Sequence, residues 1–207
     1  MTEIASPPPR LVLFDVDGTL LSSGRRGLEA FSEALTFVFG TTGDVASFRF
    51  EGKLDPVIVH ELMRGAAVPE EVIAARREAA LERYLDNLES ALAAEGPTLK
   101  PGARALVEAV AQEPAAVAAL LTGNVERGAR IKLSAAGLWH HFRFGVFGND
   151  GPRRVDLGPV ALERARRMTG IPFQGTDCVV VGDSRHDVDC GLAIGARVVA
   201  VATGRTS

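Results

Sequence analysis

Short apolar runs alternate with helical patterns along most of the chain, and three of these runs end abruptly in polar residues. Leu11–Phe14 is apolar without alternation, which is typical of a strand buried on both faces, and it ends in Asp15. Two later runs have the same form and predict further strands of one parallel sheet. They are Val117–Leu121, followed by Thr122-Gly123-Asn124, and Cys178–Val181, followed by Gly182-Asp183.

The strand–helix alternation stops between about residues 21 and 100, where apolar residues recur at helical spacing. This region predicts three helices, over Gly27–Phe39, Pro56–Met63 and Pro69–Ala94. The alternation resumes afterwards, which favours a doubly wound α/β sheet with a helical block inserted after its first strand. The later helices are expected from Pro101, over Glu126–Ala136, Val160–Met168 and His186–Ile194, with further strands over Phe144–Phe147 and Arg197–Val201.

Composition narrows the class of protein without changing this picture. The 207 residues are 46% hydrophobic and carry a net charge of −3, so charge gives no case for binding nucleic acid or a membrane surface. The two cysteines, Cys178 and Cys190, fall in predicted core elements and suggest a reducing cytoplasm. Met1–Pro9 is expected to be a loose tail without signal-peptide character.

The polar residues that follow the strands predict one ligand site, because open parallel sheets bind ligands beyond the carboxyl ends of their strands. Carboxylates at the mouth of a buried strand are costly without a cation or hydrogen-bond donors. Gly18 allows the chain to turn tightly after the first strand, and the peptide N–H groups after Asp15 could bind an anion. We therefore expect a phosphate beside a hard metal ion, among Asp15, Asp17, Thr122, Asn124, Asp183 and Asp187.

Three motifs carry a family resemblance that extends from about Arg10 to Gly204. Asp15-Val16-Asp17-Gly18-Thr19, the strand leading into Thr122-Gly123-Asn124, and Val181-Gly182-Asp183-Ser184-Arg185-His186-Asp187 resemble three of the four motifs of the haloacid dehalogenase-like hydrolases. The closer resemblance is to their phosphoglycolate-phosphatase-like branch. It implies a Rossmann-like α/β core over residues 10–20 and 101–207, with a helical cap domain over residues 21–100.

The resemblance assigns the first motif to phosphoryl transfer. Asp15 is the expected nucleophile, which would form an aspartyl-phosphate. Asp17 is the expected general acid and base, and the dehalogenases of the family lack an Asp at this position. The expected substrate is therefore a small phosphorylated metabolite, with phosphoglycolate the first suggestion.

The same resemblance implies a Mg²⁺ site and a phosphate cradle. Mg²⁺ prefers oxygen ligands, here expected from Asp15, the backbone carbonyl of Asp17, Asp183 and Asp187, the last also serving to orient its neighbours. Asp189 is interpreted as ordinary charge near a helix N-terminus. The residues expected to bind phosphate are Val16, Gly18, Thr122, Gly123 and Asn124.

The chain departs from the family at the cation expected between the second and last motifs. Members commonly carry a lysine there, but the segment 149–157 contains none. Arg154 matches the position best and can bind both carboxylate and phosphate oxygens, with Arg153 as the alternative. Lys132, on a predicted helix, is interpreted as a surface residue, and His186 as structural.

Several alternatives remain open from the sequence. A sugar-phosphate mutase shares the two-Asp motif, and a phosphonate hydrolase would need a cap lysine earlier than Lys53. A phospho-acceptor signalling domain would lack so large an insert, and a non-catalytic phosphate-binding regulator would not need complete catalytic motifs.

We expect a monomer or homodimer. Family members usually continue beyond a Thr-Gly such as Thr203-Gly204, so we expect either a shortened form or a different sheet edge. The cap candidates for binding a substrate anion are Arg25, Arg26 and Lys53.

Overall fold

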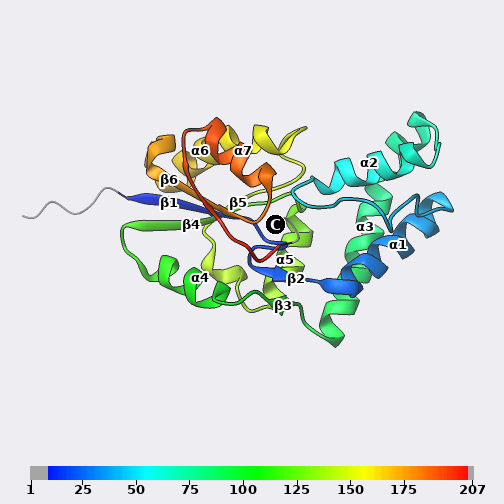
Figure 1. Ribbon diagram of the computed structural model, residues 1–207, viewed down its shortest axis with the longest axis horizontal. Helices are drawn as coiled ribbons and strands as arrows, with labels where there is room; N and C mark the ends of the chain where they lie inside the picture. The colour runs from blue at the N-terminus through cyan, green and yellow to red at the C-terminus, as the bar shows by residue number, and fades with distance from the viewer. Residues whose placement is uncertain (1–8, 205–207) are drawn as a thin grey trace, which may run out of the picture.

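The structure is a computed structural model that describes residues 9–204, so the expected tail lies outside the described residues except for Pro9. Its centre is a parallel sheet of five strands in the order β5-β4-β1-β6-β7 (Figure 1). No helix within the described part of the chain combines the length and apolarity needed to cross a bilayer. The strands are β1 (Arg10–Phe14), β4 (Ala116–Leu121), β5 (Gly145–Val146), β6 (Cys178–Gly182) and β7 (Arg197–Ala200).

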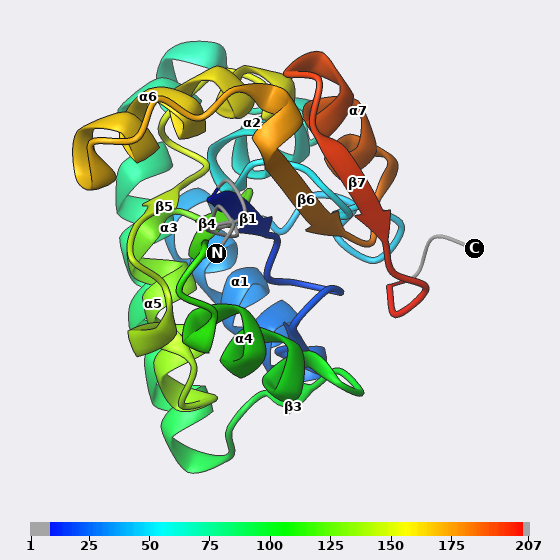
Figure 2. The ribbon, with the colours of Figure 1, turned by 90° about the vertical axis from the view of Figure 1, so that its left-hand side faces the viewer.

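Helices cover both faces of this sheet (Figure 2). The pair α4 (Ala103–Gln112) and α5 (Glu126–Ala135) covers one face, and α6 (Leu157–Thr169) with α7 (Arg185–Ala193) covers the other. Strand β1 lies in the middle of the sheet, and its side chains alternate between the two helical layers. Leu13 packs in the cluster that holds Leu157, whereas Phe14 packs in the cluster that holds Leu133. This two-sided burial is the reason that β1 is continuously apolar.

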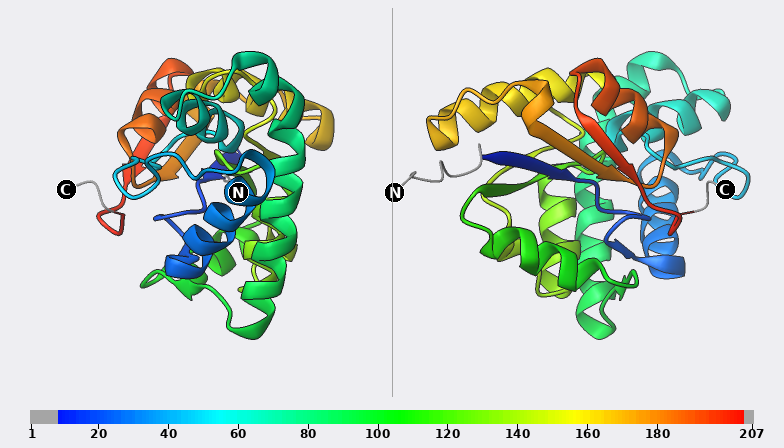
Figure 3. Two further views of the ribbon diagram at one scale, coloured as in Figure 1. Left: turned by 90° about the vertical axis from the view of Figure 1, so that its right-hand side faces the viewer. Right: turned by 60° about the vertical axis from the view of Figure 1, so that its left-hand side comes forward.

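The inserted block is helical, as its spacing predicts, and lies beside the carboxyl ends of the strands (Figures 1 and 3). The chain enters it through β2 (Leu21–Ser22) and leaves through β3 (Thr98–Leu99), and these two short strands pair antiparallel. The domain boundaries at 21 and 100 stay a prediction. The helices of the block are α1 (Gly24–Phe39), α2 (Asp55–Gly65) and α3 (Glu70–Ala94).

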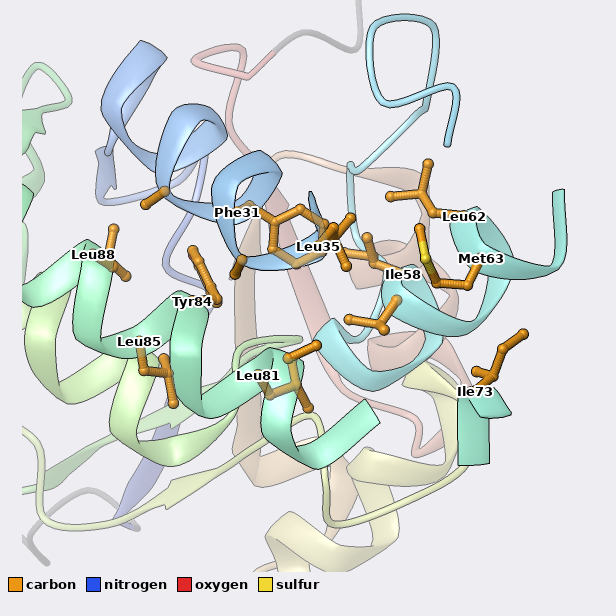
Figure 4. Packing of buried hydrophobic residues seen from close by; sticks show 14 of the residues in the cluster. Phe31, Leu35, Ile58, Leu62, Met63, Ile73, Leu81, Tyr84, Leu85 and Leu88 are labelled. Atoms are coloured by element: carbon orange, nitrogen blue, oxygen red, sulfur yellow. The ribbon is translucent and has the colours of Figure 1, made fainter. Parts of the chain in front are cut away.

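The three inserted helices share an apolar cluster of their own (Figure 4). Helix α3 presents Leu81, Tyr84, Leu85 and Leu88 on one face, since residues three and four apart lie on the same side of a helix. The Phe31 ring of α1 meets the Tyr84 ring edge-on, with centroids 5.1 Å apart. Each fully buried aliphatic side chain contributes about 1.5–3 kcal/mol, so packing rather than helix propensity holds this block together.

Helix α6 begins earlier than its sequence pattern indicates. Pro159 follows two residues after Leu157 and suggests a boundary, but it falls in the first turn of the helix. A proline is tolerated there because the N–H groups of the first turn have no partner within the helix. The short 3₁₀ turn Arg154–Asp156 leads directly into α6 and fixes where Arg154 lies. Two further 3₁₀ turns cover Trp139–His141 and Gly175–Asp177.

Candidate active site

Three carboxyl groups meet at the carboxyl edge of the sheet. Asp15 follows β1, Asp183 follows the neighbouring strand β6, and Asp187 lies in the first turn of α7. One oxygen of each lies within 4.8 Å of the others. Because Phe14 and Val181 are paired in register, the two strands end side by side and deliver their carboxylates to one place. The structure thus brings together residues that are 168 positions apart in the chain, Asp15 and Asp183.

Arg154 is the cation that faces this group. It is buried, and its Nη2 atom donates to Asp15 Oδ1 at 2.8 Å and to Asp187 Oδ1 at 2.5 Å. The same nitrogen lies 2.9 Å from the carbonyl oxygen of Leu121, at the end of β4. The alternative, Arg153, has a side chain that is 73% exposed and pairs with Asp156. The geometry therefore selects Arg154 as the partner of the expected nucleophile.

The site carries more negative than positive charge, since one guanidinium group faces three carboxyl groups. Burial raises the pKa of Asp15 to about 7, although Arg154 opposes the shift. Burial also raises the pKa of Asp183, opposed by its hydrogen bond from Thr19. Such shifts indicate carboxylates that lack sufficient counter-charge. A group of oxygen ligands with excess negative charge suits a hard divalent cation such as Mg²⁺.

Asp187 has a second set of contacts that hold its carboxyl group in place. Its Oδ2 atom accepts hydrogen bonds from the Ser184 hydroxyl at 2.6 Å and from the Ser184 backbone N–H at 3.0 Å. The bond from the Ser184 N–H, together with the Asp187 N–H that donates to Ser184 Oγ, forms a capping box at the start of α7. Asp187 therefore links the helix terminus to Arg154, whereas Asp189 lies on the exposed side with Arg185.

The backbone after Asp15 turns sharply and closes against Asp183. Gly18 has a φ of +86°, and a Cβ atom there would lie 2.3 Å from Asp183 Oδ2. Both facts require glycine. The Gly18 N–H donates to the carbonyl oxygen of Leu21 at 2.9 Å, so this donor is already used. Val16 is buried, and its carbonyl oxygen accepts from the N–H groups of Leu20 and Leu21 within the same turn.

The second motif lies directly beside the first. Thr122 and Asn124 are buried, and the Asn124 amide donates to Thr122 Oγ1 at 2.9 Å and to Asp17 Oδ2 at 2.7 Å. Gly123 meets the inserted block, because a Cβ atom there would lie 2.0 Å from the carbonyl oxygen of Lys53. The Asn124 side chain is thus engaged by Asp17 in this structure.

The expectation that Lys132 is a surface residue is wrong. Its residue exposure is 5%, and its Nζ atom lies 2.6 Å from Asp17 Oδ2. The missed signal is helical spacing, since Lys132 lies on the buried face of α5 together with Gly128, Ala129 and Leu133. A lysine on an apolar face needs a partner within reach, and Asp17 is that partner.

Asp55, at the start of α2, is another site residue that sequence reasoning missed. Its Oδ2 atom accepts from the N–H of Val125 at 2.9 Å, and its own N–H donates to the Gly123 carbonyl oxygen at 2.8 Å. Burial raises its pKa to about 6, and Lys132 opposes that shift. The inserted block therefore contacts the core at the second motif itself.

The three cations proposed to meet a substrate anion are all paired within the inserted block. Arg25 pairs with Glu29, Arg26 with Glu95, and Lys53 with Glu61. The loop before α2 instead approaches α7, because a Cβ atom at Gly52 would meet the side chains of His186 and Ser184. His186 therefore lies against the loop that contains Gly52.

Comparison with known proteins places this geometry in a family. The family model described as haloacid dehalogenase-like hydrolase matches residues 12–191. The phosphoglycolate phosphatases of Pseudomonas fluorescens (strain Pf0-1) and Pseudomonas syringae pv. tomato are 29% and 31% identical, each over 95% of this chain and 70% of the relative. The crystal structure of a hydrolase from Pseudomonas syringae has the same fold, with a TM-score of 0.70 and 23% identity over 96% of this chain and 87% of that one.

Proposed function

Because this chain belongs to the haloacid dehalogenase-like hydrolases and is a hydrolase of phosphoric monoesters, we propose that it is a Mg²⁺-dependent phosphatase of small phosphorylated metabolites. The reaction would proceed through an aspartyl-phosphate on Asp15. The observation that carries this proposal is the position of Asp15, at the end of the central strand between Arg154 and the Asp183 carboxyl group.

In the first step, a carboxylate oxygen of Asp15 attacks phosphorus and the bond from phosphorus to the ester oxygen breaks. Asp17 gives its proton to the departing oxygen. In the second step, Asp17 takes a proton from water, the water oxygen attacks phosphorus, and the aspartyl–phosphorus bond breaks. Inorganic phosphate leaves, and both carboxyl groups return to their starting states. The covalent intermediate divides one difficult displacement into two easier ones.

The Mg²⁺ ion would be held by Asp15 and Asp183, with the backbone carbonyl of Asp17 as the family resemblance implies. Supporting this, one oxygen of each carboxyl group lies within 4.8 Å of the other. When bound, the ion would supply positive charge that offsets the negative charge of the nucleophile and the phosphoryl group. Asp187 would orient the site, since both of its oxygens already accept hydrogen bonds from Arg154 and Ser184.

Phosphate oxygens would be bound by Arg154, Thr122 and the backbone around Gly123. The buried guanidinium supports this role, because charge-assisted hydrogen bonds to phosphate are strongest when water is excluded. Phosphoglycolate is the first substrate to test, since relatives of this chain are phosphoglycolate phosphatases. The cytoplasmic location expected from the cysteines stays a prediction.

The decisive experiment is the Asp15→Asn variant. We expect it to lose phosphate release from every ester in a panel of phosphorylated metabolites, while its circular dichroism spectrum matches that of the wild type. Removal of Mg²⁺ with a chelator should abolish the wild-type activity, and adding the ion back should restore it. Following phosphate release directly separates hydrolysis from a mutase, which would return the phosphoryl group to the substrate. Full activity in Asp15→Asn would refute the assignment of Asp15 as the nucleophile.

A further inference from the structure

Lys132 is a buried cation that the proposed chemistry does not use. It lies on α5, and its Nζ atom donates to Asp17 Oδ2 at 2.6 Å and to Asn124 Oδ1 at 2.5 Å. A buried ammonium group is costly unless its donors are satisfied, so its presence at this position calls for a role. Its contacts point to the one carboxyl group of the first motif that Arg154 does not bind.

The two oxygens of Asp17 are treated differently by their surroundings. Oδ2 accepts from both the Lys132 ammonium group and the Asn124 amide, whereas Oδ1 accepts no hydrogen bond from any residue within 9–204. The side chain is 44% exposed, so Oδ1 is the atom that an incoming ester can reach. Two donors on Oδ2 leave only Oδ1 free to carry a proton.

The inserted block completes the environment of Lys132. Tyr84 of α3 and Asp55 of α2 both lie close enough to favour its charged form. Burial raises the pKa of Tyr84 to about 12, so the hydroxyl group stays neutral beside the ammonium. The Lys132 side chain is therefore enclosed by groups from the core and from the cap together.

We propose that Lys132 is a positioning residue for leaving-group protonation: it fixes Asp17 through Oδ2, so that Oδ1 faces the departing oxygen with the proton. This inference rests on the proposed phosphatase function. It assigns to Lys132 a role that depends on the leaving group, because a poor leaving oxygen needs a proton in the transition state and a good one does not.

The test is the Lys132→Met variant assayed with two esters. One is 4-nitrophenyl phosphate, whose leaving group departs readily, and the other is the alkyl phosphate that the wild type hydrolyses best. The measured quantity is kcat/KM, which reports every step up to the first phosphoryl transfer. We expect kcat/KM to fall on the order of 100-fold for the alkyl phosphate. For the aryl phosphate we expect the factor of decrease to be several times smaller.

Arg127→Met is the matched control. Arg127 lies on the same helix and pairs with Glu82, Asp86 and Glu89 of α3, so its loss loosens the contact between cap and core without touching Asp17. We expect equal changes in kcat/KM for both esters in this variant. Lys132→Arg, which keeps a cation, should recover part of the alkyl-phosphate activity. Lys132→Gln replaces Lys132→Met if the latter does not fold, as judged by thermal unfolding.

Two outcomes overturn the inference in distinguishable ways. Equal losses for both esters in the Lys132 variants, with an active wild type, overturn the positioning role and leave the proposed function standing. A wild type that hydrolyses neither the alkyl nor the aryl ester overturns the proposed function and the inference with it. A preferential loss with the alkyl phosphate in Lys132→Met, absent from Arg127→Met, supports the assignment.

Discussion

Arg154 and Lys132 are two buried cations that serve neighbouring carboxylates from different parts of the molecule. All three acceptors of Arg154, on Asp15, Asp187 and Leu121, belong to the α/β core. Lys132 binds Asp17 from the core but is also enclosed by Tyr84 and Asp55 from the inserted helices. The surroundings of Asp15 are thus built by the α/β core, whereas those of Asp17 also include the inserted helices.

Replacing Arg154 should produce the largest effect and should not depend on the leaving group. Arg154→Met leaves Asp15 and Asp187 buried without their cation, which costs about 3–5 kcal/mol of unfolding free energy. We expect kcat/KM to fall about 1,000-fold or more for alkyl and aryl esters alike, because charge neutralisation at phosphorus is needed for both. Urea unfolding and steady-state kinetics measure the two effects.

Arg153→Met is the control for this prediction, since the neighbouring residue is exposed and pairs with Asp156. Exposed ion pairs contribute little because water and salt screen them, so stability and activity should stay close to those of the wild type. Equal losses in the two variants would show that the buried position of Arg154 has no special role. A leaving-group dependence in Arg154→Met would remove the contrast with Lys132.

Asp55 offers a test of the cap side of the comparison through pH. Burial raises its pKa to about 6, above the ordinary 3.8, so the folded state favours the protonated form. The stabilisation from Asp55 is fully present below about pH 4, where the carboxyl group is protonated in both the folded and the unfolded protein. It is lost as the pH rises to about 6, because the carboxyl group ionises first in the unfolded protein and only near pH 6 in the folded one. Asp55→Asn does not titrate, so its stability relative to the wild type should rise between these pH values.

Urea unfolding of the wild type and Asp55→Asn at pH 4, 5, 6 and 7 measures this difference. Asp150 provides a contrast, because Arg164 holds the pKa of that carboxyl below its usual range despite the opposing effect of partial burial. Asp150→Asn should therefore lose stability relative to the wild type as the pH rises through the acid range. If the unfolding free energies of the wild type and Asp55→Asn change in parallel with pH, the raised pKa of Asp55 is contradicted.

Tyr84→Phe should give the smallest effect. It removes the hydroxyl group near Lys132 while keeping the ring that packs on Phe31. Loss of one neutral hydrogen-bonding group costs about 1 kcal/mol, and we expect the thermal midpoint to fall accordingly. A decrease in kcat/KM that is greater for alkyl than for aryl esters would extend the role of Lys132 to the cap. A loss of kcat/KM as large as that in Arg154→Met would contradict the expected order of the effects.

Most of the fold, and the meeting of Asp15 with Asp183, follow from local patterns. The apolar runs that end in Asp15 and Asp183 predict strands of one parallel sheet, which the structure confirms; that these two strands are neighbours is visible only in the structure. Helical spacing predicts the three inserted helices, because a buried stripe is a property of the sequence alone. Arg154 was expected from the family resemblance rather than from a local pattern, with Arg153 as the alternative, and only the structure shows that Arg154 is the buried one.

The contacts of Lys132 and Asp55 could not be predicted in the same way. The first depends on how α5 packs beside the loop that follows β1, and the second on how α2 packs against the segment before α5. Both are set by tertiary packing rather than by any spacing within one segment. The position of Lys132 on an apolar helix face was the one local signal. Charge on such a face indicates a buried partner but does not say which carboxylate supplies it.

The paired strands β2 and β3 have a consequence for how such a molecule changes over evolution. They bring the two ends of the inserted block together at Leu21 and Leu99. The block is therefore joined to the five-stranded core by two chain segments that lie side by side. Longer or shorter inserts can therefore be exchanged there at little entropic cost. A change in the insert can therefore alter the surroundings of Asp17 while the paired strands that lead to Asp15 and Asp183 stay as they are.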